Sequence, residues 1–151
     1  MRQLLRESVA LLVRLTCLPW LIRRFVARRA VTIVLYHDPG PGVLRRHLEY
    51  YRTKYRMIPL RELVTALVTG DWSRIPPHAL VVTLDDGHKG NYHLLPLFRE
   101  FGVVPTIYLC SQVVGTGRRY WFKVPPKAAS MAMKLLPAED RSTLLRERHG
   151  Q

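Results

Sequence analysis

Cysteine is scarce in this chain, and its leading segment has no long uncharged run. The 151 residues include only Cys17 and Cys110, which cannot build the disulfide framework of a small secreted scaffold and leave the redox compartment open. Within the first 30 residues no uncharged stretch reaches the roughly 18 residues of a membrane span, and the longest is Leu15 to Ile22. Because Arg14 interrupts the leading apolar segment and no small-residue cleavage site is evident, we expect no cleavable signal peptide.

Acidic residues are also few, which leaves a formal net charge of +13. Residues 1–30 hold seven arginines and the single acid Glu7, a net charge of +6. On a helix, the polar and apolar side chains of this segment fall on opposite sides until Pro19: Gln3, Arg6, Glu7 and Arg14 against Leu4, Leu11, Leu12 and Leu15. The pattern predicts a basic amphipathic helix that associates with an anionic membrane surface, on an unknown side of the membrane, or that packs on a partner. The alternative, a helix that covers the rest of the domain, stays open because half-buried helices show the same stripe.

Nucleic acid is not expected as a partner, although the net charge is high. The stretch from Val31 to Cys110 has nine basic and seven acidic residues and contains no recognised nucleic-acid module. A cationic surface suits anionic lipid or acidic polysaccharide at least as well as it suits nucleic acid.

Strand and helix patterns alternate along the middle of the chain. We expect strands at Val31–Tyr36, Leu80–Leu84 and Val104–Leu109, an extended piece at Arg56–Pro59, and helices at Val43–Tyr55, Leu60–Thr69 and Tyr92–Phe101. Such alternation predicts an α/β fold with a parallel sheet, whose functional residues lie at the carboxyl ends of the strands.

Two adjacent carboxylates, Asp85 and Asp86, follow the strand that ends at Leu84. Neighbouring carboxylates repel each other unless a cation lies between them, so the pair suits a hard metal ion and general-base chemistry. Asp-Asp-Gly is also an ordinary turn opener, and these residues alone leave both interpretations open. His88, just after the turn, is expected to be an ordinary loop residue.

The surroundings of this pair form an ordered set of motifs: Tyr36-His37, Thr83-Leu84-Asp85-Asp86-Gly87, Asn91-Tyr92, Pro96-Leu97-Phe98 and the run from Phe101 to Leu109. From about Val31 to Phe122 the chain resembles the N-terminal portion of the polysaccharide deacetylase family, the NodB-type carbohydrate esterases. The family's first motif is Thr-Phe-Asp-Asp-Gly, and a Tyr-His pair precedes it in one large branch.

The resemblance implies a partial (β/α) barrel and a metal-dependent hydrolase that removes acetyl groups from an amino-sugar polymer or glycolipid. Asp85 would be the general base, Asp86 a ligand of a divalent metal, usually zinc, and His37 a substrate contact. We also take Asn91 and Trp121 as candidate substrate contacts. From the residues alone, His37 could cap a strand, Asn91 could close the Asp turn, and Trp121 could be core.

One family feature is missing from this sequence. The second motif, His-Ser/Thr-x-x-x-His, supplies two further metal ligands, and no histidine pair at that spacing follows Asp86. A barrel of this kind needs about 200 residues or more. We therefore expect a basic helix over 1–30 and the first part of a deacetylase domain over 31–151, with two short helices over 122–151 as a rim insert. The alternative is a non-catalytic carbohydrate-binding or membrane-surface protein.

Overall fold

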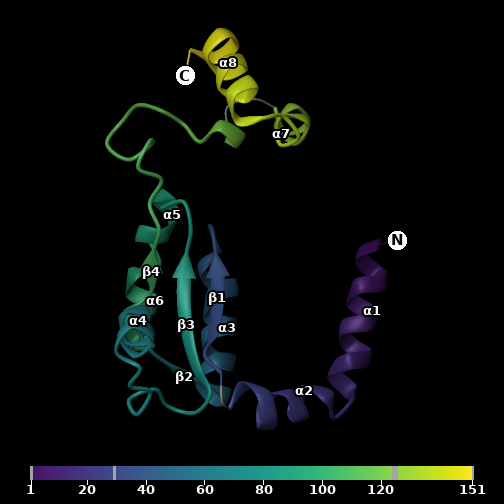
Figure 1. Cartoon of the computed structure of the whole chain (residues 1–151). Coiled ribbons are helices and arrows are strands. Elements are labelled where there is room, and N and C mark those ends of the chain that lie inside the picture. Colours follow the sequence, from purple (N-terminus) through teal and green to yellow (C-terminus); the bar gives the residue numbers. More distant parts are fainter. Residues whose placement is uncertain (1, 29, 124–125, 151) are drawn as a thin grey trace. The chain divides into compact units, whose positions relative to one another are not determined.

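The computed structural model describes residues 2–28, 30–123 and 126–150. The chain divides into two compact units, Met1–Tyr108 and Leu109–Gln151. The first unit holds the sheet and most of the helices of the chain, and the second unit holds two further α-helices (Figure 1).

Strand β3 (Ala79–Leu84) lies at the centre of a parallel sheet. It pairs with β1 (Thr32–Tyr36) on one side and with the two-residue strands β2 (Arg56–Met57) and β4 (Thr106–Ile107) on the other, all in parallel (Figure 1). All six residues of β3 are buried, as a continuous apolar run in a parallel sheet requires. The predicted α/β class is confirmed, and the strands that the structure describes form an open sheet rather than a closed barrel.

The helices of the sheet region follow the predicted order with one correction. Helices α3 (Pro41–Lys54) and α4 (Leu60–Thr69) agree with the sequence patterns. The helix predicted over 92–101 is present but shorter, as α6 (Leu95–Glu100), and it is preceded by a short helix that was not predicted, α5 (Lys89–Tyr92). Pro96 lies in the first turn of α6, where a missing backbone N–H costs nothing. The strand predicted over 104–109 is present only as the two residues of β4.

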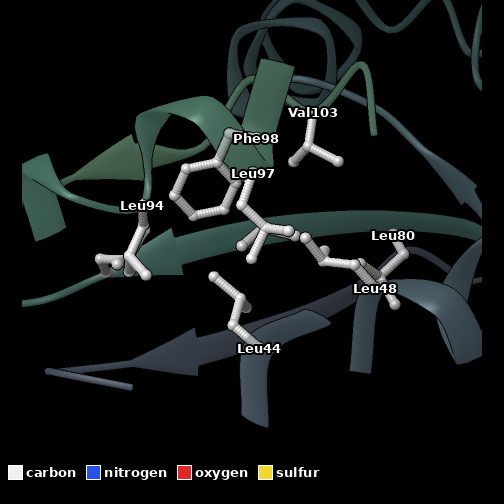
Figure 2. Packing of buried hydrophobic residues seen from close by; sticks show 9 residues of the cluster. Leu44, Leu48, Leu80, Leu94, Leu97, Phe98 and Val103 are labelled. Atoms are coloured by element: carbon white, nitrogen blue, oxygen red, sulfur yellow. The ribbon is translucent and has the colours of Figure 1, made fainter. Parts of the chain in front are cut away.

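The main core lies between one face of β3 and helices α3 and α6. Leu80 and Leu84 of β3 pack with Leu44 and Leu48 of α3, and Phe98 of α6 lies in the same cluster (Figure 2). Burying a leucine side chain completely contributes about 1.5 to 3 kcal/mol. This cluster therefore fixes the strand whose carboxyl end bears the two aspartates.

The opposite face of β3 belongs to a smaller cluster. Val81 packs there with Leu63 of α4 and Ile58. Other apolar side chains of α4 point outward: Val64, Leu67 and Val68 are 47%, 61% and 80% exposed.

The N-terminal segment consists of α1 (Arg2–Leu15), α2 (Leu18–Leu21) and the π-helix η1 (Ile22–Ala27). Pro19 lies in the first turn of α2, so it begins a new helix where the sequence predicted a change of phase. Among the described residues, no helix is both long and apolar enough to cross a bilayer. The predicted faces of α1 rest partly on Gln3, Leu4, Arg6 and Arg14, whose side chains lie outside the described part of the chain.

The second unit contains a 3-10 turn, η2 (Trp121–Lys123), and the helices α7 (Lys127–Met133) and α8 (Ala138–His149). The two predicted short helices are confirmed. The hydroxyl of Ser130 in α7 donates to the carbonyl of Phe122 at 2.9 Å, which joins α7 to η2.

Candidate functional site

Asp85 is fixed at the carboxyl end of the sheet by its backbone. Its N–H donates to the carbonyl of Tyr36 at 2.7 Å, and the preceding carbonyl, of Leu84, accepts from Tyr108 N–H at 2.8 Å. The end of β3 is therefore bound to both neighbouring segments. The bond to Tyr36 places the backbone of His37 beside Asp85, and both aspartates are half-buried while His37 is exposed.

Asp86 and Gly87 form a turn in the left-handed backbone region, with φ of 68° and 62°. Aspartate tolerates this conformation better than most side chains, but a non-glycine residue held there costs of order 1–3 kcal/mol. The Asp-Asp-Gly motif is therefore a turn, as one interpretation predicted. It also places two carboxylates at a strand end, as the metal-site interpretation requires.

His88 corrects the sequence prediction of an ordinary loop residue. The residue is 8% exposed, and its Nε2 atom lies 3.5 Å from Oδ2 of Asp86. This separation is longer than a normal N–H···O hydrogen bond. It matches the distance of about 3.4 Å expected between two ligands of one tetrahedral zinc ion with bonds of about 2.0 to 2.2 Å.

The fit of a metal ion is limited to these two donors. Catalytic zinc usually has three protein ligands, and the described residues contain no group of three His, Cys, Asp or Glu side chains that could hold a metal. Asp86 and His88 are thus compatible with part of a zinc site, and the ion itself remains a prediction.

Asp38 is a site residue that the sequence analysis missed. Its carboxylate lies against Gly90 of α5, where a Cβ atom would collide with Oδ1 and stand 3.3 Å from Cγ. A larger residue at position 90 would require the exposed Asp38 side chain to move. The contact brings the loop after β1 to the first residues after the Asp turn. Two features of the sequence could have indicated this contact. Asp38 follows His37 directly, and Gly90 lies inside a helix, where a glycine costs about 1 kcal/mol relative to alanine.

Asn91 of α5 is 4% exposed, and neither Nδ2 nor Oδ1 has a hydrogen-bond partner within the described structure. The alternative in which Asn91 closes the Asp turn with its side chain is therefore wrong. A buried amide without partners costs about 1 to 3 kcal/mol, so this position suits a side chain that meets a ligand.

A tyrosine cluster supports the end of β1. The hydroxyl of Tyr36 lies 2.8 Å from Nδ1 of His47 and 3.0 Å from the hydroxyl of Tyr51, both on α3. Burial, with a smaller contribution from the hydrogen bond to Tyr51, raises the pKa of Tyr36 far above its ordinary value. The phenol thus stays protonated and anchors the strand that leads into His37.

Trp121 lies in the second unit and is half-buried. It borders a cavity of about 320 Å³ whose other lining residues include Arg118, Arg119 and Arg146. The guanidinium carbon of Arg141 stands 4.6 Å from the centre of the indole ring, so a cation covers one ring face.

No family model and no curated protein matches the chain. Among solved structures, a de-N-acetylase from Aggregatibacter actinomycetemcomitans is similar, with a TM-score of 0.48 and 16% sequence identity. The match covers 63% of this chain and 40% of that protein. This chain therefore spans less than half of that protein's length, and a likeness of this extent assigns no activity to it.

Proposed function

We propose that this chain carries the acid–base residues of a hydrolase that removes the acetyl group from an acetylated amino sugar in a polymer or glycolipid. One observation carries the proposal: two half-buried carboxylates stand side by side at the carboxyl end of the central strand. Ligands of α/β sheets bind at that end of the strands. The motif resemblance around Asp85 and Asp86 supports the same assignment.

In the proposed reaction, Asp85 accepts a proton from the attacking water. The water oxygen bonds to the acetyl carbon, the carbon–nitrogen bond breaks, and the departing nitrogen takes up a proton, which yields acetate and a free amine. Asp86 and His88 would hold a divalent cation, zinc in our proposal, which supplies Lewis-acid polarisation and a more acidic water when bound.

Two further residues of the first unit are proposed to contact the sugar. His37 is exposed at the end of β1, next to the backbone of Asp85. Asn91 offers a buried amide that has no protein partner. Trp121, in the second unit, is proposed as a separate sugar contact, because sugars stack on flat aromatic surfaces and this ring borders a cavity.

The test compares acetate release from chitin oligomers with zinc affinity measured by calorimetry. Asp85→Asn should slow acetate release by about 100- to 10,000-fold, the usual worth of general-base assistance, and should keep zinc affinity. Asp86→Asn should lose zinc affinity itself. Asp71→Asn is the matched control, because Asp71 is an exposed loop carboxylate, and it should change neither quantity.

The outcomes separate the alternatives. If Asp85→Asn loses zinc affinity and Asp86→Asn keeps it, Asp85 is the metal ligand and Asp86 the general base. Acetate release that survives both substitutions would refute the mechanism. A second candidate, a non-catalytic carbohydrate-binding protein, is favoured by the lack of a third metal ligand among the described residues. Oligomer binding that depends on Trp121, together with no acetate release from any variant, would establish it.

A further inference from the structure

The N-terminal helices expose an unusual amount of apolar surface. Between residues 9 and 26, eleven large apolar side chains are exposed, from 37% for Leu21 to 76% for Leu15. Trp20 and Phe25 are among them, at 57% and 64%. Large apolar side chains exposed in such number along one segment indicate an interaction site.

The same segment is strongly basic. Residues 1–30 contain seven arginines and one acid. Arg24 and Arg28 are exposed, and the guanidinium carbon of Arg24 lies 5.8 Å from the centre of the Phe25 ring. Cations are therefore interleaved with apolar side chains, the combination that binds helices in the plane of an anionic membrane.

We propose that residues 9–28 form a docking surface for a membrane rich in anionic lipid, and that the helices lie in the plane of its interface. Electrostatic complementarity favours this occupant over a second copy of the chain, because two segments of net charge +6 would repel each other. Trp20 suits the boundary between headgroups and acyl chains, where tryptophan concentrates. The surface is separate from the proposed deacetylase residues, so the two proposals can fail independently.

The first test is co-sedimentation of the full chain with two kinds of vesicle. Vesicles of equal parts phosphatidylglycerol and phosphatidylcholine should bind the protein, and added salt should weaken that binding. Vesicles of phosphatidylcholine alone should bind it much less. Equal binding to both kinds would overturn the proposal, because the anionic headgroup would then contribute nothing.

Substitutions within the full chain then separate the apolar and the basic contributions. Combined replacement of Leu11, Leu12 and Leu15 by glutamine should weaken binding to the anionic vesicles by at least about tenfold. Its matched control is Leu135→Gln in the second unit, at a leucine that is 89% exposed. Arg24→Gln and Arg28→Gln should each cost about fivefold, whereas Arg46→Gln on α3 should cost nothing.

Depth of insertion gives a reading that does not rely on these variants. With Trp72 and Trp121 replaced by phenylalanine, brominated anionic lipid should quench the fluorescence of Trp20. Unchanged fluorescence, or undiminished vesicle binding by the triple leucine variant, would refute the docking surface. A glutamine variant could instead leave vesicle binding unchanged and lower the molecular mass that sedimentation gives for the protein without vesicles. That result would identify a second copy of the chain as the occupant.

Discussion

The Nε2 atom of His88 lies 3.5 Å from Oδ2 of Asp86, although the two residues are only two positions apart in the chain. Side chains two positions apart in a strand or helix do not normally meet head to head. The left-handed conformation of Asp86 and Gly87 reverses the chain and makes the contact possible. This turn, which follows the buried β3, therefore brings the carboxylate of Asp86 and the imidazole of His88 together.

His88→Gln should weaken zinc binding if His88 is a ligand together with Asp86. We expect a loss of at least about 10- to 100-fold, the effect already seen for residues that merely support a metal ligand. Calorimetric titration with zinc measures it, and His93→Gln, at the exposed histidine at the other end of α5, is the matched control. Equal zinc affinity in both variants would make His88 an ion-pair partner of Asp86 and no more.

Asn91→Leu should separate stability from binding. Leucine has a similar volume and removes an amide that is buried without partners, so the free energy of unfolding should rise by about 1 to 3 kcal/mol. Binding of chitin oligomers should fall, because the proposed sugar contact is lost. Urea denaturation and oligomer titration measure the two effects. A less stable variant would mean that the native amide is already hydrogen-bonded inside the fold, for example by a buried water.

Local patterns were sufficient to predict much of the fold. The apolar run of β3 and the helical spacing that ends at Gly70 identify their elements, because burial on both faces and a left-handed C-terminal residue leave direct marks in the sequence. The helix predicted over 92–101 corresponds to α6, whereas α5 was not predicted. A single turn of helix such as α5 is too short to show an apolar spacing in the sequence.

The candidate site was less predictable for a geometric reason. Asp85 and Asp86 stand next to each other in the sequence, and their motif identifies them. The contact of Asp38 with Gly90 joins residues 52 positions apart, and it depends on the register of β1 against β3. The burial of His88 depends on two left-handed residues before it. Neither property is visible in composition, spacing or periodicity.

The tyrosine cluster at the end of β1 should make stability depend on alkaline pH. Burial and the hydrogen bond to Tyr51 raise the pKa of Tyr36 in the folded protein. The folded state therefore keeps a proton that the unfolded chain loses above about pH 10. A raised pKa of this kind contributes stability that is fully present below about pH 10 and declines as the pH rises beyond it.

Tyr36→Phe should remove the contribution of Tyr36 to this dependence, because phenylalanine has no proton to lose. At neutral pH the variant should be less stable by about 0.5 to 1.5 kcal/mol for each hydrogen bond lost, those to His47 and Tyr51. Above about pH 10 its stability should fall less steeply than that of the unmodified protein. Urea denaturation across this pH range measures both effects, and Tyr92→Phe, at a tyrosine that is 76% exposed, is the control. Parallel alkaline declines in Tyr36→Phe and the unmodified protein would show that another group causes the loss and that Tyr36 titrates as it does in the unfolded chain.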